Sequence, residues 1–375
     1  MTERSARVVT LTRFGAEPEV RSVPLPDVLE PGAVLVEVEC ATVCGTDVHA
    51  WRGDLKPDLD LSEGYVLGHE CVGRVVAFGP GPQEDTLGDP LAVGDRLVWT
   101  GESCGRCPEC TGLGEPGLCL RRRGYLTDPS SRFPFVTGSF AEYAYVYPRA
   151  ERVRVPDEVK STWASAASCA LRTVVHGFER LGRIGHAQSV LIQGAGPLGL
   201  FAVAVARRAG ARRIIVVGDP APRLDVARAW GADIVVPLSV AGGQRAETVL
   251  DATDGRGPDV VIEASGSPEA FEEGFELARI GARYLSLGAV GPARARVSPG
   301  VLNRKQLTVL GTWSASARHL RDALAFLAAA RGEVDFDLLL SGDYSLDSVG
   351  AALVGMLEGR EVKPVIWMAP RDPGA

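Results

Sequence analysis

Four of the eight cysteines lie close together, in the run Cys104-Gly-Arg-Cys107-Pro-Glu-Cys110 and then at Cys119. Thiols three residues apart, with a fourth after a Gly- and Pro-rich turn, can surround one tetrahedral Zn²⁺ without any regular secondary structure. Four thiolates leave the ion no open position, so we predict a structural zinc here and no chemistry on a substrate. The alternative, four unrelated cysteines, is disfavoured because such clusters are rare.

A second set of candidate ligands is spread along the chain: Cys44, His69 beside Glu70, and far downstream Cys169. Two thiolates and an imidazole leave zinc one open position for water or a substrate oxygen, which is the arrangement of catalytic zinc sites. Taken singly, each residue is as well explained as a buried cysteine or a hydrogen-bonded histidine. Only the combination indicates a metal centre.

A glycine-rich turn is the third candidate site. It directly follows the apolar run 189–192 and precedes a helical pattern. In such a strand, turn and helix, unpaired N–H groups at the helix start can hold a pyrophosphate. Glycine is abundant, at 44 of 375 residues, so the motif alone could be an ordinary turn. However, a second strand-like run, 213–217, ends about 20 residues later in an acid that could hold an adenosine ribose. We therefore predict a dinucleotide site comprising Gly194, Gly196, Pro197, Leu198, Gly199 and Asp219.

The elements that must position these residues change character along the chain. Short β-branched runs separated by Pro and Gly predict a barrel-like β domain, with strands at 6–11, 34–38, 72–78, 96–99 and 140–146. Alternating helices and strands then predict a doubly wound parallel sheet, with helices at 162–181, 198–209, 223–230 and 268–279 and strands at 189–193, 213–217, 259–263, 283–287 and 307–310. The tail predicts a helix at 317–330, a strand at 336–340, a helix at 346–357 and a strand at 362–368. We assign no element to residues 121–137, which could overhang the substrate cleft.

Composition excludes several classes of partner. The chain has 375 residues, 46% of them hydrophobic, and a net charge of −7, which argues against nucleic acid as the main partner. No apolar run approaches about 18 residues and the first residues lack a hydrophobic signal core, so we expect no membrane association and a cytoplasmic protein. Cysteines in that compartment are metal ligands, catalytic thiols or core residues before they are disulfides.

These motifs, the run 46–54 and their order along the chain resemble the zinc-dependent medium-chain alcohol dehydrogenase family over nearly the whole sequence. The resemblance implies an α/β protein in which a GroES-like β-barrel catalytic domain (1–170) precedes a Rossmann domain (171–313). A C-terminal segment (314–375) would complete the catalytic domain. It implies catalytic zinc on Cys44, His69 and Cys169, two Zn²⁺ per chain, and a homodimer or homotetramer. The interval between Cys110 and Cys119 is one residue longer than is usual in the family, and we expect residues 114–117 to absorb it.

The resemblance also implies roles for individual side chains. Thr46 would hydrogen-bond to the alcohol, whose proton would pass through the ribose to His49 and then to solvent. Asp47 would accept a hydrogen bond from His69, and Glu70 would lie beside the metal as a possible transient ligand. Lys363 matches a basic position near both Glu70 and the nucleotide phosphates. It is Lys where Arg is common, and an ammonium lacks the bidentate fork of a guanidinium.

The identity of the cofactor follows from charge. The family's ribose-binding acid falls on Gly218, and the acid here is Asp219, one residue later. A carboxylate near the 2′ position repels a 2′-phosphate, which favours NAD. Arg223 falls where a basic residue contacts the ribose in relatives and keeps NADP possible. Ser265 and Gly288 follow predicted strands, at the edge where the nicotinamide half of the cofactor is expected.

The expected activity is hydride transfer between an alcohol and NAD(P), or carbonyl reduction in the reverse direction, at zinc that polarises the alcohol oxygen. A polyol, amino-alcohol or threonine dehydrogenase or a carbonyl reductase remains open, because neither substrate nor direction can be inferred from the motifs. An inactive nucleotide-binding relative is the alternative from another class. The intact set of Cys44, His69, Glu70 and Cys169 argues against it.

Overall fold

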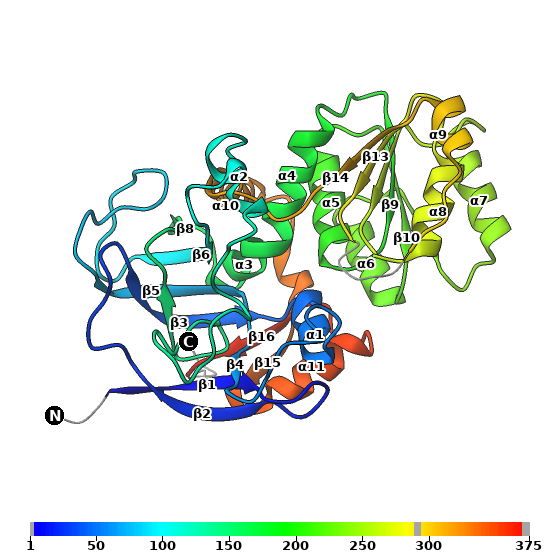
Figure 1. Ribbon diagram of the computed structural model, residues 1–375. Coiled ribbons are helices and arrows are strands. Elements are labelled where there is room, and N and C mark those ends of the chain that lie inside the picture. Colours follow the sequence, from blue (N-terminus) through cyan, green and yellow to red (C-terminus); the bar gives the residue numbers. More distant parts are fainter. Residues whose placement is uncertain (1–3, 289–293, 370–375) are drawn as a thin grey trace. The chain divides into compact units, whose positions relative to one another are not determined.

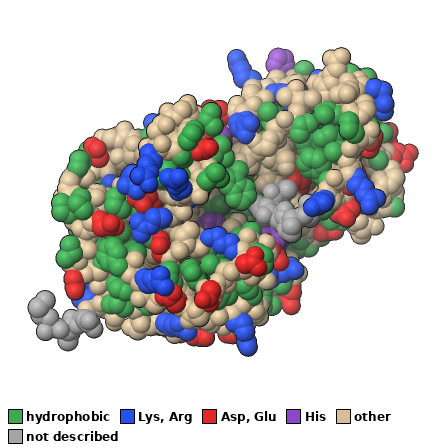
Figure 2. Space-filling view, in the orientation of Figure 1, with side chains coloured by type: hydrophobic (Ala, Val, Ile, Leu, Met, Phe, Trp, Pro, Cys, Tyr) green, Lys and Arg blue, Asp and Glu red, His purple; other side chains and the backbone are tan. Residues whose placement is uncertain are grey.

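The computed structural model describes residues 4–288 and 294–369, which form two compact units. The first unit covers the described chain up to Arg172, then Ser314–Ala329, and the described chain from Leu340 on. The second unit comprises Thr173–Trp313 and Ala330–Leu339. Within the described ranges, no helix combines the length and the apolar character that crossing a membrane requires. Basic and acidic side chains are interspersed on the face shown in Figure 2.

The first unit is built on two sheets, in strand orders β2-β1-β4 and β15-β16-β3-β5-β6-β8, with β7 paired to β3. The predicted strands at 6–11, 34–38, 72–78 and 96–99 fall within β1, β3, β5 and β6, whereas β2 and β8 were not predicted. The C-terminal strand β16 pairs antiparallel with β3, and Figure 1 shows its red ribbon beside the blue one. Apart from Ala330–Leu339, the described part of the C-terminal segment thus belongs to the first unit. The strands are β1 Ser5–Leu11, β2 Glu19–Pro24, β3 Val34–Thr42, β4 Tyr65–Val66, β5 Glu70–Phe78, β6 Arg96–Glu102, β7 Tyr143–Val146, β8 Ala150–Arg154, β15 Ser341–Ser345 and β16 Pro364–Trp367.

One predicted helix, 162–181, is helical throughout but changes type in its middle. It consists of α3 (Ser161–Ala166), a π-helical segment (Ala167–Leu171) and α4 (Arg172–Leu181). A π turn inside an α-helix often accompanies a functional site. Here it contains Cys169. From Thr173 on, α4 belongs to the second unit. The first unit also has the helices α1 Gly45–Arg52, α2 Pro108–Thr111, α11 Val349–Leu357 and α10 Ala317–Ala330, the last without its final residue.

The second unit has a six-stranded parallel sheet in the order β11-β10-β9-β12-β13-β14. Strands β9, β10 and β12 are almost wholly buried, which explains their unbroken apolar runs. Helices α5 and α6 pack together, as do α7, α8 and α9, so the sheet is doubly wound. The elements are β9 Ser189–Gln193, α5 Pro197–Arg208, β10 Arg213–Gly218, α6 Ala221–Ala229, β11 Ile234–Pro237, α7 Gly242–Asp251, β12 Val260–Glu263, α8 Pro268–Leu277, β13 Arg283–Ser286, α9 Pro299–Lys305 and β14 Thr308–Gly311.

The strand predicted at 336–340 is wrong. Residues Phe336–Leu339 form a 3₁₀ turn, and the strand β15 begins only at Ser341. The Phe336 ring is buried against Trp230 and Phe201, at centroid distances of 5.6 and 6.5 Å. Burial of this aromatic ring in the second unit therefore decides the local conformation. The short elements β11, α7 and α9 were not predicted.

Candidate active site and cofactor site

Four predicted residues of the first unit come together in space. Cys44, His69, Glu70 and Cys169 each offer a ligand atom, and these atoms lie within 4.8 Å of one another. Antiparallel pairing of β3 with β5 brings the end of one strand, and Cys44 after it, to the start of the other. The π-helical segment supplies Cys169. The cluster therefore draws on three separate parts of the chain.

Asp47 links two of these residues. It is completely buried at the third position of α1, where one carboxylate oxygen accepts the Cys44 N–H at 2.9 Å. The other lies 2.9 Å from His69 Nδ1. An ionised carboxylate can only accept, so Nδ1 of His69 carries a proton, and Nε2 is the nitrogen that would bind a metal ion in place of a proton. His69 Nε2 is buried without a hydrogen-bond partner among the described residues, as expected of an atom facing a metal ion.

The electrostatics of the cluster suit a metal that is bound by anions. The hydrogen bond with Cys169 lowers the pKa of Cys44 well below its ordinary value, although burial opposes the change. Burial also lowers the pKa of His69, but the charge and hydrogen bond of Asp47 outweigh it and the pKa lies well above 6.5. One thiolate is therefore favoured even before a cation is considered.

Glu70 lies in a buried polar network beside these ligands. Its Oε2 accepts a hydrogen bond from Thr42 Oγ1 at 2.7 Å and lies 2.6 Å from Lys363 Nζ. Thr42 Oγ1 is also 3.0 Å from the Ser165 hydroxyl. Burial raises the pKa of Glu70 to about 8, against the opposing charge of Lys363. The Lys363 ammonium therefore contacts Glu70, and its contact with the nucleotide phosphates stays a prediction.

Thr46 and His49 both lie on α1 and are half-buried, three residues apart and so on neighbouring parts of one helix face. His49 Nδ1 lies 3.0 Å from Asp54 Oδ2. The roles of Thr46 and His49 in proton transfer stay predictions.

Sequence reasoning missed the position of Tyr125. Its ring centroid lies 4.9 Å from that of His69, and its hydroxyl is buried without a partner among the described residues. The surrounding segment is held by Lys56, which donates to the Leu126 carbonyl, and by Tyr147, which donates to Asp128. The sequence analysis allowed residues 121–137 to overhang the substrate cleft, but no periodicity marks the segment, so the contact of Tyr125 with His69 was not predicted.

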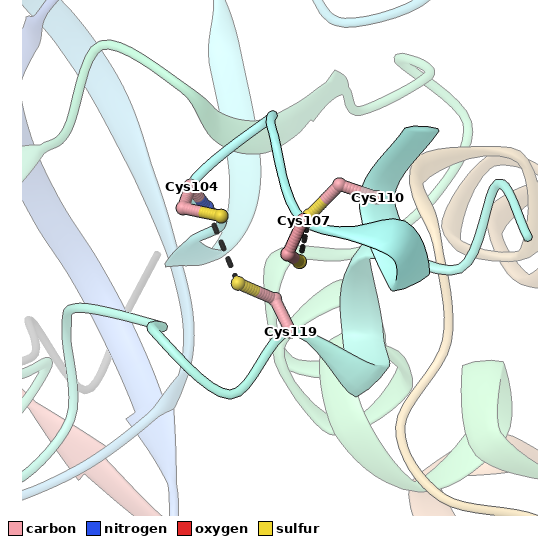
Figure 3. Close-up of side chains that lie close together, drawn as sticks. All are labelled: Cys104, Cys107, Cys110 and Cys119. Atoms are coloured by element: carbon pink, nitrogen blue, oxygen red, sulfur yellow. Dashed lines mark hydrogen bonds between the residues drawn. The ribbon is translucent and has the colours of Figure 1, made fainter. Parts of the chain in front are cut away.

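The cysteine lobe, residues 104–119, brings its four sulfur atoms together (Figure 3). Cys107 Sγ and Cys110 Sγ are 3.3 Å apart, well beyond the roughly 2.05 Å of a disulfide. The N–H groups of Cys104 and Arg121 donate to Cys119 Sγ at 3.3 and 3.4 Å. Backbone hydrogen bonding from Arg106 lowers the pKa of Cys104 to about 6. The thiolate of Cys104, a form that suits zinc, is therefore favoured, whereas hydrogen bonding with Glu109 raises the pKa of Cys107.

Some glycines of the motif in the second unit leave no room for a side chain, whereas another faces open space. A Cβ on Gly199 would lie 1.9 Å from the Gly194 carbonyl oxygen, and Gly194 has φ +109°. Gly196, the N-cap of α5, has nothing within 4 Å of a Cβ and offers no side chain to the helix start, which Pro197 and Leu198 form. A side chain at Gly196 would project into open space at the start of α5, where the phosphates of the cofactor are predicted to lie.

The other predicted cofactor residues follow the carboxyl ends of β10, β12 and β13. A Cβ on Gly218 would lie 2.7 Å from the Ala195 N, whereas Asp219 is exposed and Arg223 half-buried on α6. Glu263 Oε1 accepts the N–H groups of Ser265 and Gly266 at 2.6 and 2.7 Å, which fixes that loop. A Cβ on Gly288 would lie 2.4 Å from the Gly266 N. Only glycine fits where these two loops meet.

Comparison with known proteins yields matches over most of the chain. Residues 30–157 match the family described as alcohol dehydrogenase GroES-like domain, and residues 197–329 match that described as zinc-binding dehydrogenase. The chain is 33% identical over 355 residues to 5-exo-hydroxycamphor dehydrogenase of Pseudomonas putida, covering 93% of this chain and 95% of that protein. It is 32% identical over 377 residues to L-threonine 3-dehydrogenase of Pyrococcus abyssi, covering 98% and 100%. A solved alcohol dehydrogenase of Thermotoga maritima matches with a TM-score of 0.89 at 30% identity, covering 97% and 99%.

Proposed function

The chain belongs to the zinc-dependent medium-chain alcohol dehydrogenase family and is an oxidoreductase acting on an alcohol with NAD(P), and we propose that Cys44, His69 and Cys169 hold its catalytic zinc. The observation that carries the proposal is the Asp47 carboxylate, which accepts hydrogen bonds from the Cys44 N–H and from His69 Nδ1. That carboxylate leaves the buried His69 Nε2 without a partner among the described residues. Ordinary core packing gives no reason for a sealed imidazole nitrogen to face two thiols.

Each residue around this site has a separate role in the proposed alcohol oxidation. Zinc supplies a Lewis acid that lowers the pKa of the alcohol. Asp47 orients His69, and Glu70 adds a carboxylate beside the ligands whose charge is matched by Lys363. The Thr46 hydroxyl accepts the hydrogen bond of the alcohol, and His49 passes the proton toward solvent.

A second zinc, held by Cys104, Cys107, Cys110 and Cys119, is the other part of the metal proposal. Four convergent sulfur atoms support it, together with two backbone N–H groups that stabilise negative charge on Cys119. Because this site has no open position, it holds the lobe in place and takes no part in the reaction. Purified chain should therefore contain two zinc atoms.

NAD is the preferred cofactor in this proposal. The exposed carboxylate of Asp219 follows β10 and would repel a 2′-phosphate. Arg223, on the next helix, is the residue that would favour NADP. Asp219→Gly should raise the affinity for NADPH relative to NADH, measured by titration of nucleotide fluorescence. An unchanged ratio would mean that the ribose is recognised elsewhere.

Secondary alcohols are the proposed substrates. The names of the two relatives place the reacting hydroxyl on carbon 5 of camphor and carbon 3 of threonine, both of them secondary carbons. A panel of secondary, primary, polyhydroxy and amino alcohols, followed by NADH absorbance, shows whether secondary hydroxyls are preferred and whether the substrate carries further hydroxyl or amino groups. Faster oxidation of the primary alcohols would contradict the proposed preference.

The metal proposal is tested with matched cysteine variants. Cys44→Ala should lose one zinc and all turnover but retain NADH binding, because the dinucleotide motif lies in the other unit. Cys71→Ala is the control, since this buried thiol of the same unit lies outside the ligand cluster. Turnover by Cys44→Ala, or two zinc atoms in it, would refute the assignment.

We further propose a homodimer or homotetramer in the cytoplasm. Strand β14 ends the parallel sheet, and most of its residues are exposed, so its edge is available for a second copy. The two cysteine clusters need a reducing compartment to hold metal. A monomeric mass in sedimentation would contradict the first part, and secretion of the native chain the second.

A further inference from the structure

Helix α1 ends in a turn that brings its last residues back over the helix. Gly53 has φ +86° and donates its N–H to the Ala50 carbonyl at 3.1 Å, and Asp54 donates its N–H to the His49 carbonyl at 2.9 Å. This pair of hydrogen bonds defines a Schellman motif, in which the second residue after the helix meets the residue five positions before it. Asp54 is therefore held against His49 by the backbone.

The turn strongly favours glycine at its centre. A Cβ on Gly53 would lie 3.0 to 3.2 Å from three atoms of the Phe14 ring, and the left-handed backbone there disfavours any side chain. The Gly15 N–H also donates to the Trp51 carbonyl at 2.8 Å, which fixes the end of α1 from outside. The position of Asp54 relative to His49 is thus set by packing.

The side chains of Asp54 and His49 meet at the two positions that often form an apolar contact in Schellman motifs. Asp54 Oδ2 lies 3.0 Å from His49 Nδ1, and Arg52 Nε lies 3.6 Å from the same oxygen. A carboxylate can only accept, so the proton of the neutral imidazole must be on Nδ1. The lone pair is then on Nε2, the nitrogen that remains to accept a proton.

We propose that Asp54 is the positioning residue for His49: it holds the imidazole in the Nδ1–H tautomer so that Nε2 accepts the proton released by the alcohol. The inference rests on the proposed function, which assigns the proton relay to His49. In the oxidation, the carbon–hydrogen bond gives its electron pair to the nicotinamide as hydride. The hydroxyl proton passes to His49 Nε2 and then to water, leaving a carbonyl.

The tautomer can be observed directly. With five histidines in the chain, imidazole ¹⁵N spectra can be assigned by single His→Gln variants. Neutral His49 should show a protonated Nδ1 in the native protein and a mixture of tautomers in Asp54→Ala. A native spectrum with the proton on Nε2 would overturn the proposal, whatever the activity.

Kinetics test the consequence. Because the pair is half-exposed, Asp54→Ala should lower kcat about tenfold, with KM changed less than about twofold. Asp54→Glu should restore part of the rate, and Arg52→Gln, which leaves the carboxylate on His49, should be near native. A native kcat in Asp54→Ala would overturn the proposal.

Epistasis separates this inference from the proposed function. If Asp54 acts through His49, then Asp54→Ala should have no further effect on kcat in a His49→Gln background. An equal loss in both backgrounds would overturn the inference while leaving the relay intact. A native rate in His49→Gln would instead refute the relay itself, and with it the role of Asp54.

Discussion

The ammonium of Lys363 lies 2.6 Å from Glu70 Oε2, and the two side chains are 1% and 0% exposed. Burial of an ion pair removes both charges from water, and only their mutual attraction and further hydrogen bonds offset that cost. Thr42 supplies one such hydrogen bond. The pair therefore joins the C-terminal segment to β5, which begins at Glu70 directly after His69, next to the candidate zinc ligands.

Removing one partner of this pair should destabilise the protein strongly. Lys363→Met removes the counter-ion of the buried Glu70, whose pKa burial already raises to about 8, so the carboxyl takes up a proton and the lost attraction should lower the free energy of unfolding by about 1–3 kcal/mol. The control is Arg7→Met, because Arg7 and Asp347 are also 2.6 Å apart but 44% and 63% exposed. The control should cost at most about 1 kcal/mol in urea unfolding. Equal losses would show that burial of Glu70 does not govern the effect.

Two substitutions in the glycine motif should affect different properties, one the binding of NADH and the other the stability of the fold. Gly196→Val places a side chain in open space before α5, so the fold should persist while NADH binding weakens at least about tenfold. Gly199→Ala forces a Cβ against the Gly194 carbonyl and should lower thermal stability by several degrees. Calorimetry and NADH fluorescence measure the two effects. Tight NADH binding by Gly196→Val would place the phosphates elsewhere.

The cysteine ligands of the lobe should be needed for an ordered lobe but not for nucleotide binding. Cys110→Ser removes one of four sulfur ligands, so the chain should lose one zinc and residues 104–119 should become sensitive to proteolysis. NADH binding should be unchanged, because the glycine motif belongs to the other unit. Metal analysis and limited proteolysis check both points. Retention of two zinc atoms with an intact lobe would contradict the assignment.

The parts of the fold that could be predicted are those where sequence and burial agree locally. Strands such as β9 and β12 are buried at every position and carry unbroken apolar runs, because helices cover both faces of a parallel sheet. Strand β11 is short and only partly buried, so it left no comparable signal. Phe336 gave the opposite error, because an apolar run looked like a strand although aromatic packing determines its conformation.

In the candidate site, too, some residues could be predicted from the sequence and others could not. Cys44, His69 and Cys169 were predicted because ligand chemistry restricts residue types, and the structure brings them together. Asp54 and Tyr125 were not assigned a partner, because their contacts depend on a helix cap and on the path of an irregular segment. Gly53 before Asp54 was the available signal, since a glycine after a helix indicates a C-cap whose next residue turns back.

Asp259 gives a pH-dependent prediction for the second unit. One oxygen accepts the Ser189 N–H and hydroxyl at 2.8 and 2.9 Å, and the other accepts Arg279 Nε at 2.6 Å. Burial would raise the pKa of Asp259, but these hydrogen bonds outweigh it and the pKa lies below 3.8. The unfolded chain therefore binds this proton first, so the stabilisation is complete above about pH 4 and is lost as pH falls through the folded pKa.

Asp259→Asn should be less stable than the native chain at pH 7, by about 1–3 kcal/mol in urea unfolding, and the difference should shrink below pH 4. A difference that is constant from pH 7 to pH 3 would mean that the charge of Asp259 contributes nothing.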